Sequence, residues 1–122
     1  MASSTLLADL FRTIDARDSA AFVRFLTPDV RFRFGSAPAV TGQDAVQQAV
    51  TGFFSSIKAL SHRLLSTWEQ GDALIVQGEV TYTRHDGSQI TLPFANIFRI
   101  QNKLINEYLV YADLAPLFQA PT

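Results

Sequence analysis

The sequence predicts one α+β domain spanning residues 1–122, in which N-terminal helices pack on a strongly curved, mostly antiparallel sheet. Two observations predict this fold class. Apolar residues recur at helical spacing in the first half of the chain and at a period of two from His62 onward. The second half also divides into four alternating segments separated by short polar turns, the pattern of an antiparallel meander. We expect such a sheet to curl around the helices and enclose a conical cavity.

The composition is that of a packed domain without a dominant charge. Hydrophobic residues make up 48% of the chain and charged residues 17%, which is enough to bury a core. The net charge is −1 and the basic residues are scattered, so we expect no nucleic-acid partner. The absence of cysteine excludes disulfides and is compatible with the cytoplasmic location that we predict. We expect no membrane span and no signal peptide, since no long apolar run occurs.

The first 34 residues predict two helices followed by a short strand. An apolar stripe predicts a helix over residues 1–16, and Asp18 is placed to cap a second short helix that ends at Thr27–Asp29. Residues 30–34 alternate as a strand.

A third helix is predicted to follow this strand. Thr41–Asp44 resembles a capping box, and the apolar positions of this helix extend to Leu60. We interpret Gly52, inside this helix, as a point of close packing against the sheet.

The hairpin between residues 73–83 and the next strand has two possible registers. A two-residue Asp-Gly loop would turn the two apolar faces to opposite sides of the sheet. A three-residue loop His85–Gly87, with Gly87 left-handed, pairs Tyr82 with Ile90 and aligns the faces. We therefore predict the second register, which places Asn96 near Val76.

The same register sets Gly78 opposite Phe94. Because Gly78 interrupts an apolar face, it indicates a bend or bulge. The last strand, after the turn at residues 101–103, is partly apolar on both faces. A sheet that is apolar on both sides is expected to hold helices on one side and a second copy on the other. We therefore predict a homodimer through the outer sheet face.

The order of elements resembles the nuclear transport factor 2-like (NTF2-like) superfamily, especially its SnoaL-like branch. The residues that carry the resemblance are Pro93–Ile100, Leu104–Tyr108 and Tyr111–Asp113, together with the helix opening Gly42–Val46. The resemblance implies the conical fold and a pocket for a small apolar ligand. It implies no single activity, because this family includes isomerases, cyclases, epoxide hydrolases, dehydratases and non-catalytic modules.

Two well-defined catalytic sets of the family are not retained. The ketosteroid isomerase set would place its base near Arg33 or Phe34, its tyrosine at Leu10 and its neutral acid at Asn96. The limonene-epoxide hydrolase set fits no better. His62 and His85 lack the spacing of metal ligands, and the usual nucleotide-binding and serine-hydrolase signatures do not occur, so we expect neither metal nor cofactor.

The candidate site lies on the last two strands. Asn96 stands in an apolar face, where it is either a polar group of the pocket or a core amide bonded to a neighbour. Asp113 is the candidate acid, and its alternative role is to cap the turn that follows. The candidate ligand contacts are Tyr82, Phe94, Phe98, Tyr111, Trp68 and His62, and the alternative places for these residues are the core, the surface and the interface.

Two functions remain open at this point. In the first, the protein is an isomerase- or cyclase-type enzyme in which Asp113 moves a proton on an apolar carbonyl or enol substrate, while Asn96 and a tyrosine hold the oxygen. In the second, it is a non-catalytic ligand-binding or dimeric assembly domain. The first requires Asp113 and Asn96 to open into one cavity.

Overall fold

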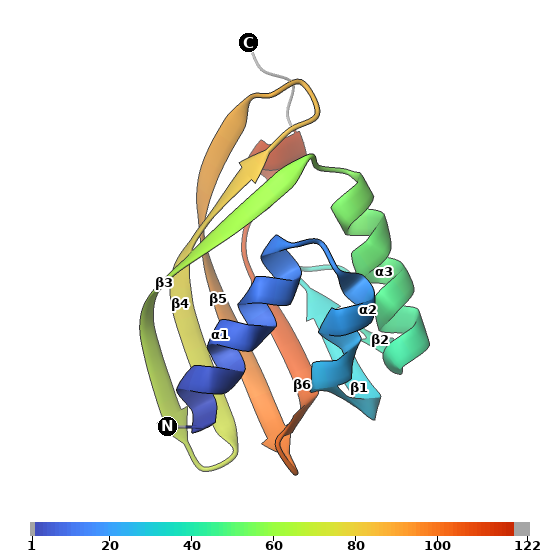
Figure 1. Cartoon of the computed structure of the whole chain (residues 1–122), viewed down its shortest axis with the longest axis vertical. Helices are drawn as coiled ribbons and strands as arrows, with labels where there is room; N and C mark the ends of the chain where they lie inside the picture. The colour runs from blue at the N-terminus through green and yellow to red at the C-terminus, as the bar shows by residue number, and fades with distance from the viewer. Residues whose placement is uncertain (1, 119–122) are drawn as a thin grey trace.

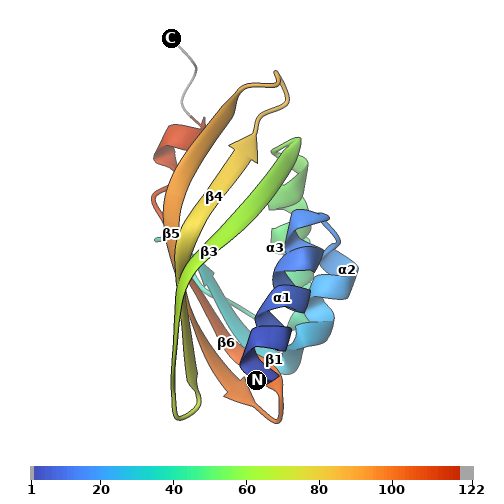
Figure 2. The same cartoon turned by 60° about the vertical axis from the view of Figure 1, so that its left-hand side comes forward.

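The structure is a computed structural model that describes residues 2–118, with side chains from residue 5 onward. Its α helices lie over one face of a six-stranded sheet, which bends around them without closing into a barrel (Figures 1 and 2). The predicted α+β architecture is confirmed. Among the described residues, no helix has the length and apolar character needed to cross a membrane.

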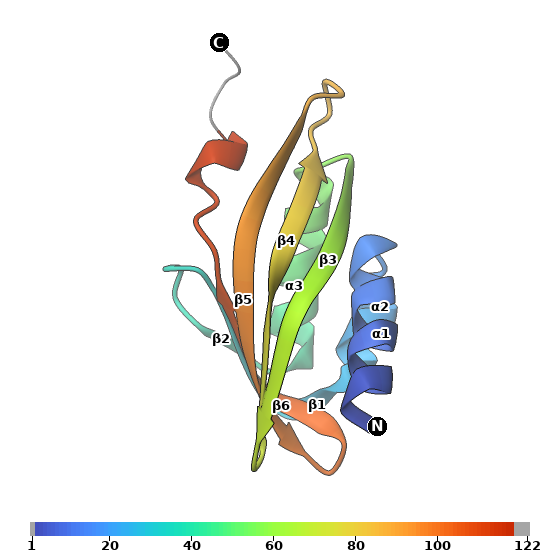
Figure 3. The same ribbon diagram turned by 90° about the vertical axis from the view of Figure 1, so that its left-hand side faces the viewer.

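The sheet has the strand order β2-β1-β6-β5-β4-β3. Four long strands form the predicted antiparallel meander: β3 (Ala59–Gln70), β4 (Ala73–Thr83), β5 (Gln89–Gln101) and β6 (Leu104–Tyr111). Strand β1 (Leu26–Phe34) joins β6 in parallel, and β2 (Val40–Thr41) extends that edge. The C-terminal 3₁₀ turn η2 (Ala115–Phe118) returns toward the β4–β5 hairpin (Figure 3).

The N-terminal helices follow their sequence signals. Helix α1 (Ala2–Asp15) buries one apolar stripe against the sheet. Asp18 caps α2 (Ser19–Phe22), because its Oδ1 accepts a hydrogen bond from the Ala21 amide at 3.0 Å. After the short 3₁₀ turn η1 (Val23–Phe25), the chain enters β1 at Leu26, earlier than predicted.

Three predictions about α3 (Gln43–Ser55) are wrong. The helix ends before Leu60, which lies on β3 opposite Tyr82. Thr41 does not cap it, because Thr41 is paired within β2 and the N-cap is Gly42, whose φ of 96° favours glycine. Gly52 is exposed, and a Cβ built there would meet no atom within 4 Å, so close packing does not explain it.

The predicted register of the β4–β5 hairpin is confirmed. Tyr82 pairs with Ile90, and the Arg84 amide donates to the Ser88 carbonyl at 2.8 Å across the three-residue loop. Gly87 has a φ of 91°. Along the same ladder Asn96 lies opposite Val76, which directs Asn96 to the concave face.

A bulge in β3 lies beside Gly78, as the glycine indicated. The register of β3 against β4 shifts between Leu64 and Ser66. A Cβ on Gly78 would lie 2.2 Å from the Arg63 carbonyl oxygen, so no other residue fits there without moving backbone. Because the bulge adds one residue, it reverses which residues of β3 face the helices.

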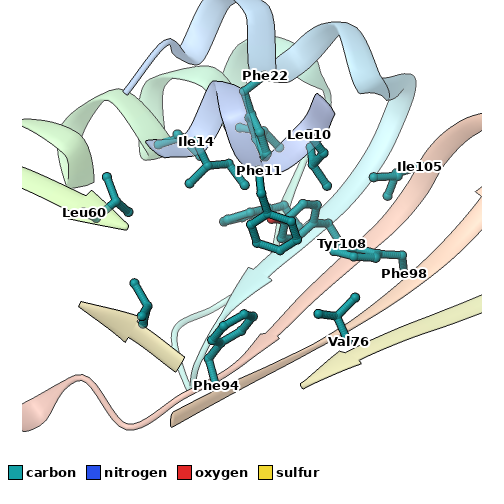
Figure 4. Close-up of a cluster of buried hydrophobic side chains, with 14 of the residues drawn as sticks. Leu10, Phe11, Ile14, Phe22, Leu60, Val76, Phe94, Phe98, Ile105 and Tyr108 are labelled. Atoms are coloured by element: carbon teal, nitrogen blue, oxygen red, sulfur yellow. The ribbon is translucent and has the colours of Figure 1, made fainter. Parts of the chain in front are cut away.

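The core fills the space between α1, α2 and the concave sheet face. In Figure 4, side chains of the helices, including Leu10, Phe11 and Ile14, project toward Phe94 and Phe98 of β5. All five are buried, with exposed fractions of 7% or less. The strands of the meander thereby hold the helices over one end of the curved sheet.

Candidate functional site

A cavity of about 320 Å³ lies between the helices and the concave face of the sheet. Nine of its described lining residues are Phe or Tyr, and most others are aliphatic. None of the described lining residues is a lysine, an arginine or a carboxylate. Polar functional groups enter it only from four of the described side chains, namely His62, Tyr82, Asn96 and Tyr108. The cavity therefore suits an uncharged, largely apolar ligand.

Four of the residues selected from the sequence line this cavity. They are Asn96, Tyr82, Phe94 and His62. Asn96 combines the two roles left open for it. It is 3% exposed and its Nδ2 donates to the Leu109 carbonyl oxygen at 3.3 Å, yet it also lines the cavity. Since an amide NH₂ group carries two hydrogens, one remains for a ligand.

His62 forms a pair with Asp15 at the end of α1. The imidazole Nδ1 lies 2.6 Å from Asp15 Oδ1, and the His62 backbone amide donates to Asp15 Oδ2 at 3.1 Å. The ring also packs between two aromatic side chains, with centroid distances of 4.8 Å to Phe11 and 5.1 Å to Phe94. The side chain of His62 is 10% exposed, whereas that of Asp15 is 31% exposed. These contacts fix both the position and the plane of the imidazole.

The pairing also assigns roles to the two imidazole nitrogens. An ionised carboxylate only accepts hydrogen bonds, so Nδ1 carries the hydrogen that faces Asp15. In the neutral ring Nε2 then has a free lone pair. No residue of the described chain hydrogen-bonds Nε2. Nor is Nε2 among the described side-chain atoms that are fully buried without a hydrogen-bond partner, so it is accessible. Since His62 lines the cavity, Nε2 is the nitrogen available to a ligand.

Two buried tyrosines supply the remaining polar groups. Tyr82 and Tyr108 are each 4% exposed, and burial raises the pKa of both hydroxyls well above their usual range. For Tyr108, the charge of an ionised Tyr82 would raise the pKa further. Both side chains therefore stay neutral at ordinary pH and can donate a hydrogen bond.

Asp113 is not among the residues that line this cavity, so the requirement that it share one space with Asn96 is not met. Asp113 follows β6, is exposed, and accepts a hydrogen bond from the Ala115 amide at 3.1 Å. This is the turn-capping role that the sequence left as its alternative. Val110 pairs with Asn96, so the outward-facing positions of β6 are those of Leu109 and Tyr111, and Asp113 continues beyond that strand.

Three more candidate contacts lie outside the cavity lining. Trp68 shares the parity of His62, but the bulge after Leu64 sets it opposite Ile75 on the outer face, where it is 53% exposed. Tyr111 is 54% exposed on the same face, opposite Ala95. Phe98 faces the helices but is fully buried in the core below the cavity.

Asp15 and Tyr108 are the polar residues that the sequence reasoning missed. Asp15 is the last residue of α1, and nothing in the local pattern shows that it meets a strand 47 residues later. Tyr108 did leave a signal, because it alternates in phase with Val110, the partner of Asn96. Fixing the register of β6 against β5 would have placed it inside.

The described residues contain no group of three or more His, Cys, Asp or Glu side chains placed to hold a metal ion. The His62–Asp15 pair is thus a two-residue arrangement, with an imidazole toward the cavity and a carboxylate behind it. Such a pair can accept and return a proton.

Helices over an open, curved sheet, with a cavity between them, define this chain as an NTF2-like protein. Within that class it belongs to the SnoaL-like domain family, whose sequence pattern matches residues 7–108. No curated protein matches the chain in sequence. The family and fold support a ligand-binding or cyclase-type domain.

Solved structures share the fold at low sequence identity. An NTF2-like protein of unknown function from Burkholderia pseudomallei superposes with a TM-score of 0.85 at 19% identity, over 96% of this chain and 95% of that one. A putative SnoaL-like polyketide cyclase from Jannaschia gives 0.85 at 19% identity, over 99% and 94%. TerC, co-crystallised with polyporic acid, gives 0.82 at 15% identity, over 96% and 95%.

Proposed function

We propose that this protein is an acid–base enzyme of the isomerase or cyclase type, acting on an uncharged, apolar carbonyl or enol compound in the cavity. The observation that carries the proposal is the His62–Asp15 pair, at 2.6 Å, in a cavity with no charged lining residue among those described. The similarity to a putative polyketide cyclase and to a protein crystallised with polyporic acid supports the same class of ligand.

In the proposed reaction His62 is the catalytic residue. Nε2 takes a proton from the carbon next to the carbonyl, and the electrons of the broken C–H bond form the enolate. Returning the proton to another carbon completes an isomerisation. In a cyclisation, the enolate carbon instead attacks a second carbonyl of the same molecule, and the proton goes to the new alkoxide. Neither route needs a co-reactant.

Asp15 acts through His62 and is a positioning residue. It holds Nδ1 in the protonated tautomer and stabilises the imidazolium that forms when Nε2 takes a proton. Asn96, with one amide hydrogen left over, is placed in the same cavity to hold the developing oxyanion.

Hydrogen exchange on 2-tetralone, a small uncharged ketone, tests this function. In D₂O we expect the protein to accelerate deuterium incorporation beside the carbonyl, followed by NMR. His62→Gln should abolish the acceleration, and Asp15→Asn should lower it by about 10²- to 10⁴-fold. Asp113→Asn is the matched control and should leave it unchanged. If calorimetry shows 2-tetralone bound while exchange proceeds at the rate of buffer, the function is that of a non-catalytic binding domain.

We further propose that the outer sheet face pairs with a second copy of the chain. Trp68, Ile75, Ile97 and Leu109 lie side by side across four strands and form one apolar row. Two ion pairs flank the row, so positive and negative charges occur together there. Arg31 pairs with Glu107 at 3.1 Å, and Arg99 pairs with Asp72 at 3.2 Å. A two-fold pairing of such a face brings apolar rows together without opposing large charges of one sign.

A further inference from the structure

We propose that the hydroxyls of Tyr82 and Tyr108 select a flat, unsaturated, uncharged ligand that carries two separate oxygen acceptors, one for each hydroxyl. This inference rests on the proposed function, because it concerns the ligand of the same cavity. It assigns a specificity role to Tyr108, which the acid–base reaction does not use.

Neither hydroxyl has a hydrogen-bond partner among the described residues, although both side chains are 4% exposed. A buried hydroxyl without a partner costs free energy unless water or a ligand satisfies it. Within the described chain, however, the one side-chain polar atom that is fully buried and has no hydrogen-bond partner is Asn106 Oδ1. The two tyrosine hydroxyls therefore open onto accessible space, and the space that both residues line is the cavity.

The two tyrosines approach this cavity from different ends. Tyr82 pairs with Ile90 on β5, whereas Tyr108 pairs with Phe98, eight residues farther along the same strand. Eight residues of strand correspond to roughly 26 Å of backbone. Both side chains nevertheless line the same cavity, and their hydroxyls remain within electrostatic reach, since an ionised Tyr82 would affect Tyr108. Hydroxyls that enter from opposite ends contact different atoms of a ligand.

The rest of the cavity wall defines the body of the ligand. Aromatic rings pack around both tyrosines, with Phe53 at 5.8 Å from the ring of Tyr82 and Phe32 at 5.2 Å from that of Tyr108. Rings of this kind favour stacking and edge contacts with flat, conjugated molecules. Because no lysine or arginine occurs among the described lining residues, a carboxylate or phosphate would lose its hydration without compensation.

A graded set of probes tests the inference through binding alone. Naphthalene has no oxygen, 2-tetralone has one, and 1,4-naphthoquinone has two on opposite sides of the ring. By calorimetry or ligand-observed NMR we expect affinity to rise in that order. Tyr82→Phe and Tyr108→Phe should each weaken 1,4-naphthoquinone binding by about five- to tenfold, the value of one neutral hydrogen bond, and leave naphthalene binding unchanged.

Tyr111→Phe is the matched control, because it removes the same hydroxyl from the exposed outer face. It should change none of the three affinities. Equal affinity for all three probes, or equal loss of naphthalene and 1,4-naphthoquinone in the tyrosine variants, would overturn the inference. Binding is measured without turnover, so this result is independent of the exchange reaction.

Discussion

The concave and convex faces of the sheet are built from neighbouring residues of the same strands, yet they present different surfaces. One row across the sheet contains Val76, Asn96 and Val110 and faces the helices and cavity. The next row, one residue along each strand, contains Ile75, Ile97 and Leu109 and faces outward. Since the side-chain period of a strand is two, a slip of one residue would exchange the cavity lining for the outer surface. Register therefore decides which side chains line the cavity.

The separation of inward-facing and outward-facing side chains depends most on the bulge in β3. It allows His62 to face inward and Trp68, six residues later, to face outward. Gly78→Val should disrupt it, because the Cβ would lie 2.2 Å from the Arg63 carbonyl oxygen. We expect a loss of at least about 3 kcal/mol in the free energy of unfolding, measured by urea denaturation.

The control for this substitution is Gly52→Ala. Gly52 lies in α3 with no atom within 4 Å of an added Cβ, so alanine should raise stability by up to about 1 kcal/mol. Equal effects of the two substitutions would show that the bulge does not depend on Gly78.

The same bulge marks the limit of prediction from sequence. The hairpin register, and with it the inward placement of Asn96, followed from the left-handed Gly87 and the alignment of two apolar faces. Alternation alone gave Trp68 the same parity as His62 and could not decide between the pocket and the interface, because the extra residue in β3 is not visible in the local sequence pattern. Asp15 was out of reach for another reason. Its contact with His62 joins residues that only the packing of α1 on the sheet brings together.

The outer row of Trp68, Ile75, Ile97 and Leu109 is the centre of the proposed dimer interface. Trp68→Glu places a charge at the β3 end of the apolar row, on the residue of the row with the largest exposed side chain, and we expect it to weaken self-association by about tenfold to a hundredfold. Thr91→Glu is the control, since Thr91 lies on β5 six residues from Ile97 and outside the row. Sedimentation equilibrium gives both constants. A wild-type protein that is monomeric at micromolar concentration would contradict the role of this face.

The buried tyrosines give the concave face a distinct response to alkali. Burial raises the pKa of Tyr108 in the folded state, while the unfolded residue ionises near pH 10. The unfolded state thus loses a proton that the folded state keeps, and stability falls as the pH rises above about 10. At pH 11 the loss for Tyr108 is about 1.4 kcal/mol relative to pH 9. Urea unfolding at both values should show a smaller decline in Tyr108→Phe, and an unchanged decline would place the hydroxyl in solvent.

Asp113 provides the smallest effect and the clearest contrast with Asp15. Its carboxylate accepts one hydrogen bond, from the Ala115 amide, at an exposed turn. Asp113→Ala should therefore cost about 0.5–1 kcal/mol of stability and leave binding and exchange of 2-tetralone unchanged. Asp72→Ala, which removes an exposed ion pair with Arg99, should cost less than that. If Asp113→Ala instead lowered exchange as strongly as Asp15→Asn, Asp113 would take part in the reaction after all, because a turn cap has no means of altering proton transfer at His62.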